Sequence, residues 1–103
     1  MSKIVFSEDA WEAYLYWQSQ DKKTLKKINT LLKTIQRTPF SGEGKPEPLK
    51  GTRNWSRRIN EKDRLVYCIE EGYINVIQCK GHYRDKYSIL KSGYSAKYSN
   101  NNS

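Results

Sequence analysis

The spacing of the apolar residues changes midway along the chain, at a segment that holds all three prolines, and this change constrains the fold most. Before Pro39, apolar residues recur at intervals of three and four, which is the period of a helix. After Pro48 they alternate with polar residues, which is the period of a strand. A chain of 103 residues has room for one small domain. We therefore expect a helical first half and a sheet-forming second half around one core.

The first half predicts a short strand followed by a helical hairpin. The strand is the apolar run Lys3–Phe6. Ser7 and Asp21 can each cap a helix, because their side-chain oxygens accept hydrogen bonds from the first turn. The apolar face expected for the second helix consists of Leu25, Ile28, Leu32 and Ile35. Two helices joined this tightly form a hairpin, which needs a surface to cover.

The second helix also carries a predicted basic stripe. Its members are Lys22, Lys26, Lys33 and Arg37. The whole chain has 19 Lys and Arg against 11 Asp and Glu, which gives a formal net charge of +8. Clustered cations suit the phosphates of nucleic acid. A solvated basic helix face is the ordinary alternative, and charge by itself leaves both interpretations open.

Three alternating runs follow and predict an antiparallel meander. They extend over residues 54–60, 64–70 and 73–80, and polar turns join them. In the first run, Trp55, Arg57 and Ile59 share one face. A helical hairpin covers only one side of such a sheet, so the expected architecture is α+β with the other side open. The residues expected on the open side are Arg58, Arg64 and His82.

The aromatic and sulfur-containing residues indicate what fills the core and argue against a zinc site. Trp11, Trp17 and Trp55 should each anchor a patch of core. Cys68 and Cys79 fall in expected strands and are most simply small buried apolar residues. One histidine and two cysteines do not complete a usual four-ligand zinc site, so we expect no metal and no cofactor. Without a secretory signal or an apolar span of about 20 residues, we expect a cytoplasmic protein with no membrane contact.

The charged residues expected on the open side match the needs of a metal-free ribonuclease. Cleavage through the 2′-hydroxyl needs a base for its proton, an acid for the leaving 5′-oxygen, and cations around the phosphate. Glu47 is a candidate base, and the prolines on either side restrain its backbone. His82 is a candidate acid. The candidate phosphate-binding residues are Arg64, Lys50, Arg57 and Arg58.

Each of these residues also has an ordinary structural alternative. Glu47 can be an exposed residue of a rigid connector. Strand arginines can cover a sheet edge or pair with acids such as Glu61 and Asp63. A histidine at a strand end is more often a surface residue than a catalyst. The residues alone therefore leave an RNA-binding protein and a nuclease both open.

Several blocks of sequence occur in the order found in one toxin family. These blocks are Tyr14-Leu15-Tyr16-Trp17-Gln18, Lys26-Lys27-Ile28-Asn29, Arg37-Thr38-Pro39-Phe40, Gly44-Lys45-Pro46-Glu47-Pro48-Leu49-Lys50, Trp55-Ser56-Arg57-Arg58-Ile59, Arg64-Leu65-Val66-Tyr67 and His82-Tyr83. On these blocks the chain resembles the YoeB-type toxins of the RelE superfamily, the ribosome-dependent mRNA interferases of bacterial toxin–antitoxin pairs. We accordingly expect a toxin domain at residues 1–83 and a C-terminal extension at 84–103 that is partly disordered.

The resemblance implies a microbial-RNase-like fold and cleavage of mRNA in the ribosomal A site. It makes Glu47 the general base, His82 the general acid and Arg64 the residue that stabilises the phosphate. The supporting cations are Lys50 and Arg58. Tyr83 matches the family's terminal tyrosine, which positions the substrate or stacks on a base. This chain departs from the family in a shorter connector at Gly51–Asn54 and in continuing beyond Tyr83.

The resemblance also implies partners. These are mRNA, the 70S ribosome, a YefM-like antitoxin that folds on binding, and a second copy in a homodimer, with the basic stripe facing the ribosome. Two alternatives stay open. One is a non-catalytic toxin on the same fold, like gyrase-poisoning relatives, which generally lack the acid–base residues. The other is a basic RNA- or ribosome-binding module without activity.

Overall fold

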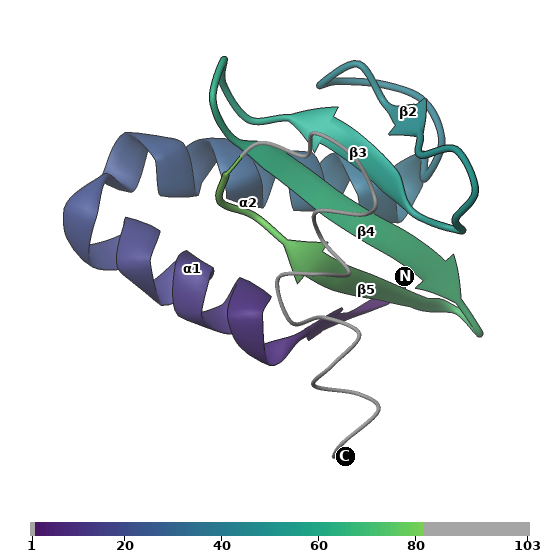
Figure 1. Ribbon diagram of the computed structural model, residues 1–103, viewed down its shortest axis with the longest axis horizontal. Coiled ribbons are helices and arrows are strands. Elements are labelled where there is room, and N and C mark those ends of the chain that lie inside the picture. The colour runs from purple at the N-terminus through teal and green to yellow at the C-terminus, as the bar shows by residue number, and fades with distance from the viewer. Residues whose placement is uncertain (1, 82–103) are drawn as a thin grey trace.

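The structure, a computed structural model, describes residues 2–81, which form two helices packed on one face of a five-stranded sheet (Figure 1). The strands are β1 (Lys3–Phe6), β2 (Glu47–Pro48), β3 (Trp55–Arg58), β4 (Arg64–Glu70) and β5 (Tyr73–Gln78). The helices are α1 (Glu8–Gln20) and α2 (Lys22–Arg37). The strand order across the sheet is β1-β5-β4-β3-β2. The expected α+β class, with an N-terminal strand and a helical hairpin on the sheet, is confirmed.

The sheet is mixed. The expected antiparallel meander consists of β3, β4 and β5, but β1 pairs with β5 in parallel. A local pattern predicts that a strand exists and not its direction, because direction depends on the path of the intervening chain. The short strand β2 was not expected. It forms because Glu47 precedes a proline, which favours extended backbone, and it pairs with Ser56 and Trp55 of β3.

Both expected helix caps are present. The Oγ of Ser7 accepts the N–H of Ala10 at 3.0 Å. The carboxylate of Asp21 accepts the N–H of Thr24 at 3.2 Å and its hydroxyl at 2.8 Å. These hydrogen bonds hold the pKa of Asp21 below its ordinary value. Because Asp21 alone joins α1 to α2, the hairpin has a short and well-fixed corner.

The main core lies between the helices and the sheet. Its most deeply buried aliphatic members are Ile28, Leu31, Ile35, Leu65, Ile74 and Val76. Trp17 is also buried, and its Nε1–H donates to the carbonyl of Cys79 at 2.9 Å. Trp55 packs at the edge of this core. The expectation that Trp11 anchors the core is wrong: Trp11 is 48% exposed and stacks on Tyr14 at the surface.

A second, smaller apolar cluster lies on the opposite side of the sheet, which we call the helix-free face. Its members are Leu49, Val66 and Ile77, with Cys68 packed against them. Ile77 is the one extra residue that β5 holds between the partners of Val66 and Tyr67, which is a β-bulge, so Gln78 and not Ile77 pairs with Val66. As a result Val76 and Cys79, on either side of the bulge, both belong to the main core.

Candidate functional site

Three expected site residues project from neighbouring strands onto the helix-free face. Val66 marks this face because it belongs to the small cluster there. Ser56 pairs with Val66 and Glu47 pairs with Ser56, and paired residues point to the same side of a sheet. Two positions along the same strands, Arg58 pairs with Arg64, and residues two apart share a face. The register therefore gathers Glu47, Arg58 and Arg64 on one side.

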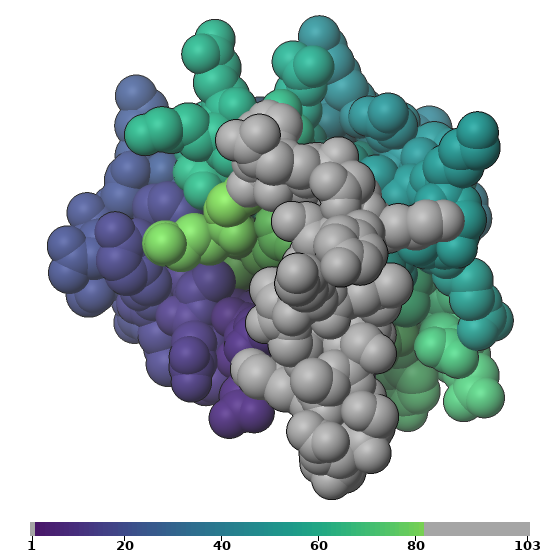
Figure 2. All heavy atoms as spheres, in the orientation of Figure 1, coloured from purple at the N-terminus to yellow at the C-terminus, as the bar shows by residue number. Residues whose placement is uncertain are grey.

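The spacing of the strands puts these three side chains near enough to one another to reach the same nucleotide linkage. Arg58 is the diagonal neighbour of Glu47 across two strands, a separation of about 7–8 Å that long side chains can span. Arg64 is one strand further away, which adds about 5 Å. Glu47 and Arg58 are exposed and Arg64 is half-buried. In the space-filling view of this face, the β2 region and the β3–β4 turn project along the upper edge (Figure 2).

Arg64 is held firmly at the start of β4. Its Nη1 donates to the carbonyl of Asn60 at 2.7 Å and to that of Asp63 at 3.2 Å. Its backbone N–H donates to the carbonyl of Gly81 at 2.9 Å. The N–H of Gly81 donates in turn to Oδ1 of Asp63 at 2.8 Å. The start of β4 and the end of the described chain thus form one hydrogen-bonded unit.

The expected acid His82 and the neighbouring Tyr83 lie outside the described residues, as does the expected extension at 84–103. The structure does describe where the chain is held immediately before them. Gly81 directly precedes His82 in the sequence, and Gly81 is bonded to Arg64 and Asp63. Sequence connectivity therefore joins His82 to the anchored end of the sheet.

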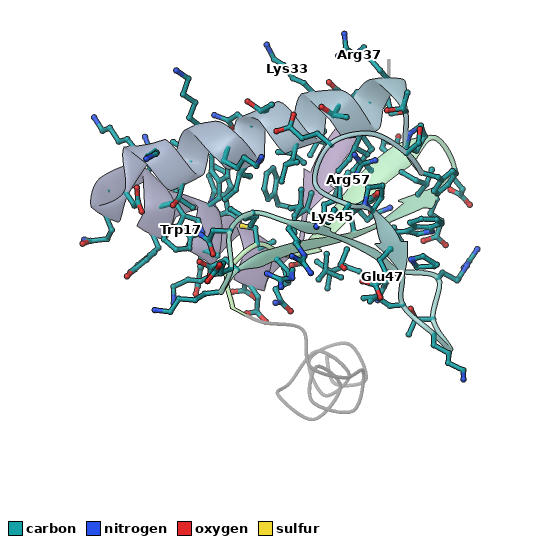
Figure 3. The ribbon with its side chains drawn as sticks, turned by 90° about the horizontal axis from the view of Figure 1, so that it is seen from above. Trp17, Lys33, Arg37, Lys45, Glu47 and Arg57 are labelled. Atoms are coloured by element: carbon teal, nitrogen blue, oxygen red, sulfur yellow. The ribbon has the colours of Figure 1, made fainter. Side chains whose placement is uncertain are left out.

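Arg57 does not lie on the helix-free face, so the expectation that it binds phosphate there is wrong. Its side chain is fully buried and points toward α2 (Figure 3). Its guanidinium donates four hydrogen bonds, to the Tyr67 hydroxyl at 3.0 Å and to the carbonyls of Glu43 at 2.8 Å, Thr38 at 2.8 Å and Ser41 at 2.9 Å. These bonds compensate for the loss of water around the charge. Arg58, one position along, necessarily faces the other side.

Tyr67 completes this buried group. Its hydroxyl accepts from Arg57 and donates to the carbonyl of Pro39 at 2.7 Å. Burial raises the pKa of Tyr67, and the hydrogen bond from Arg57 opposes this shift. The hydroxyl therefore keeps its proton at neutral pH and can continue to donate to Pro39.

Two further residues, Lys50 and Ser56, lie near Glu47. Lys50, an expected phosphate-binding residue, is exposed in the turn after β2, where no strand pairing fixes its direction. Ser56, which sequence reasoning missed, lies directly opposite Glu47 and is buried. Only the pairing of β2 with β3 reveals Ser56, and no local pattern carries that information.

The basic stripe is exposed as expected but lies far from the candidate site. All four of its members, Lys22, Lys26, Lys33 and Arg37, are exposed. Figure 3 shows Lys33 and Arg37 pointing away from the sheet, on the opposite side of the molecule from Glu47. One phosphate group cannot contact both surfaces. The stripe and the candidate site could therefore share a ligand only if that ligand is large enough to extend around the domain.

The two cysteines are free thiols. Burial, with a smaller contribution from the charge of Asp63, raises the pKa of Cys79 to about 12. Burial also raises the pKa of Cys68. Within residues 2–81, no group of three His, Cys, Asp or Glu side chains could hold a metal ion. In the same range, neither helix is long and apolar enough to cross a membrane.

Comparison with known proteins decides the family. The model of the YoeB-like toxin of bacterial type II toxin–antitoxin systems matches residues 6–83. The chain belongs to this YoeB family. Toxin YoeB of Escherichia coli K12 is 51% identical over 83 residues, covering 79% of this chain and 99% of that protein. Toxin YoeB of a Synechocystis strain is 52% identical over 84 residues, covering 80% and 98% respectively.

Solved structures of YoeB proteins have the same fold. The YoeB/ParE toxin from Agrobacterium tumefaciens matches with a TM-score of 0.78 at 45% identity, covering 79% of this chain and 99% of that one. A YoeB dimer from Staphylococcus aureus matches with a TM-score of 0.76 at 49% identity, covering 80% and 98%. A heterotetrameric YoeB–YefM complex from the same species matches with a TM-score of 0.74 at 49% identity, covering 81% and 99%. This YoeB family member is thus a toxin of a type II toxin–antitoxin system.

Proposed function

We propose that this toxin is a metal-independent endoribonuclease that cleaves mRNA in the A site of the ribosome. The observation that carries the proposal is the strand register that gathers the carboxylate of Glu47 and the guanidinium groups of Arg58 and Arg64 on one face. A carboxylate beside two arginines suits a reaction that needs a base and a stabilised phosphate in the same place. Membership of the YoeB family supports the assignment.

In the proposed reaction, Glu47 removes the proton of the 2′-hydroxyl and the 2′-oxygen attacks the neighbouring phosphorus. Arg64, with Arg58, stabilises the negative charge of the pentacoordinate phosphate, since arginine can donate two parallel hydrogen bonds to its oxygens. The bond from phosphorus to the 5′-oxygen then breaks, and His82 gives that oxygen a proton. The products are a 2′,3′-cyclic phosphate and a 5′-hydroxyl. Tyr83 positions the substrate, and Lys50 adds positive charge.

We further propose the partners that the relatives' structures suggest. The Staphylococcus aureus YoeB structures include a complex with YefM and a dimer, so a YefM-like antitoxin and a second copy are the expected protein partners here. The stripe on α2 would face ribosomal RNA, a ligand that is large enough to reach both sides of the domain. Residues 1–83 would form the toxin domain, and 84–103 an extension to it.

The test is cleavage of a reporter mRNA on translating ribosomes, mapped by primer extension. We compare the wild type with Glu47→Ala, His82→Gln and a matched control, Glu12→Ala, which removes an exposed carboxylate from α1. Loss of a general base or acid lowers the rate by about 100-fold or more, while the control should cleave normally. Equal cleavage by all four proteins would refute the catalytic assignment. Ribosome binding without cleavage by the wild type would instead favour the inactive RNA-binding module.

A further inference from the structure

We propose that Arg57 is a positioning residue: its buried guanidinium ties the segment before β2 to the sheet and so aims the carboxylate of Glu47 without touching RNA. The inference rests on the proposed function, because it concerns the base of that reaction. It assigns a different role to the arginine that sequence reasoning placed among the phosphate ligands.

Arg57 makes most of its hydrogen bonds to the segment that leads into β2. Its three carbonyl acceptors, Thr38, Ser41 and Glu43, all lie in the connection between α2 and β2, at 2.8–2.9 Å. The strand that carries Glu47 is two residues long and pairs only with β3. So short a strand cannot fix its own direction. The direction is therefore set largely by what holds the preceding segment.

The segment is also packed tightly around this guanidinium. A Cβ added at Gly44 would lie 2.9 Å from Cδ2 of Leu31 and 3.1 Å from Cβ of Arg57. A Cβ added at Gly42 would lie 3.6 Å from Nη1 of Arg57. The hydroxyl of Tyr67 adds a second anchor through the carbonyl of Pro39. The position of the segment is thus determined by both packing and hydrogen bonds.

The hydrogen bonds of this segment are followed, just before Glu47, by an unusual backbone conformation. Arg57 holds the carbonyl of Glu43, and the N–H of Arg58 holds the carbonyl of Gly44 at 2.7 Å. The next residue, Lys45, has a φ of 52°, a left-handed conformation that residues other than glycine rarely adopt. The two clamped carbonyls impose this turn, which directs the chain through Pro46 into Glu47.

Filling this space does not by itself require an arginine, but an apolar side chain would leave the three carbonyls of the segment without a donor. What arginine adds is a rigid planar group with donors in several fixed directions. Here those donors reach three separate carbonyls and one hydroxyl, which fixes the shape of the segment. Because Arg57 is fully buried, it acts on RNA only through another residue.

The experiment weakens the anchor in two ways. Tyr67→Phe keeps the ring and removes the hydroxyl that joins Arg57 to Pro39. Arg57→Lys keeps the charge but cannot reach all four acceptors. The matched control Ile74→Val removes one methylene group from the main core at a residue paired with β1 and β4. Each protein is assayed by single-turnover cleavage on ribosomes carrying reporter mRNA, at a temperature where circular dichroism shows it to be folded.

We expect the rate per folded molecule to fall about 10-fold for Tyr67→Phe and about 100-fold for Arg57→Lys, since a misplacement of about 1 Å can cost 100-fold. Ile74→Val should cleave at the wild-type rate. Ribosome affinity and its salt dependence should not change, because no phosphate contact is lost. The decisive readout is a double-mutant cycle: Tyr67→Phe should have no further effect in a Glu47→Ala background, where there is no carboxylate to misplace.

Two outcomes would overturn the inference while leaving the proposed function intact. One is wild-type cleavage by both Tyr67→Phe and Arg57→Lys when both are folded. The other is an equal loss of rate with and without Glu47, which would show an effect that does not pass through the carboxylate. If Glu47→Ala itself cleaves normally, the proposed function fails, and the inference fails with it.

Discussion

Arg57 and Arg58 are neighbours on β3, yet they occupy opposite faces of the sheet and have different surroundings. On the helix side, Arg57 is fully buried and donates four hydrogen bonds within the protein. On the helix-free face, Arg58 is exposed beside the pair of Glu47 and Ser56. In a sheet covered on one side, the parity of a position decides whether an arginine is buried against the helices or exposed on the other face.

Two other pairs of like residues also differ in how closely they are surrounded. Cys79 belongs to the main core, while Cys68 packs against the small cluster on the helix-free face. Gly44 lies in the segment held by Arg57, while Gly72 lies in the β4–β5 turn with no atom within 4 Å of an added Cβ. Each pair offers one closely surrounded and one more open residue of the same type, so each can test the effect of the surroundings.

The largest effect is expected from exchanging the two arginines for methionine. Arg57→Met leaves several buried carbonyls without a donor, and each costs about 1–3 kcal/mol, so the free energy of unfolding should fall by about 3 kcal/mol or more. Arg58→Met removes an exposed side chain and should change it by less than about 0.5 kcal/mol. Urea denaturation followed by tryptophan fluorescence measures both. Similar losses for the two variants would contradict the distinction between the faces.

A smaller effect is expected from the two glycines. Both have positive φ, 91° at Gly44 and 81° at Gly72, so alanine is strained at either position by about 1–2 kcal/mol. Gly44→Ala must also displace Leu31 or Arg57, which adds about 1–3 kcal/mol. Thermal unfolding should therefore show a clearly larger loss of stability for Gly44→Ala than for Gly72→Ala. If the losses are equal, the segment before β2 is less tightly packed than described.

The last prediction concerns the two thiols, where the expected effect on the free energy of unfolding is the smallest. Their rates of alkylation should nevertheless differ clearly. With its pKa raised to about 12, Cys79 is almost entirely protonated at pH 8, so iodoacetamide should label it at least about 10-fold more slowly than Cys68. The raised pKa stabilises the fold below about pH 9, and this contribution is lost as the pH rises toward 12. Mass spectrometry of peptides follows the labelling. In urea both thiols should react alike, and equal protection in the native protein would contradict the prediction.

Sequence reasoning succeeded where the determinants are local. Ser7 and Asp21 cap the helices because their own side chains reach the first turn. Sequence reasoning was wrong where the determinants lie far away in the sequence. The alternation placed Arg57 with Trp55 and Ile59, but its charge suggested exposure. The carbonyls that satisfy that charge belong to residues 14–19 positions away, and a local pattern does not show them.

The candidate site divides in the same way. The residues alone offered Glu47 as a candidate base and Arg64 as a candidate phosphate ligand, and the family resemblance implied the same roles. Their gathering on one face depends on β2, on the pairing of Glu47 with Ser56 and on the register of β3 with β4. The alternation predicted Arg58 and Arg64 on the open side, but the pairing of Glu47 with Ser56 has no signature in the sequence, because it depends on a partner strand. The roles of the site residues stay predictions until the variants are assayed.

The bulge in β5 decides which of the residues beyond it return to the core. If β5 were regular with the same residues, Cys79 would turn outward, and its carbonyl would no longer lie where Trp17 donates to it. The anchor between Gly81 and Arg64 would shift as well. Deletion of Ile77 would instead remove the bulge and leave Cys79 two positions after Val76, on the same face. The strand can therefore lose this one residue and keep its inner face, whereas one added residue would turn every later side chain to the other side.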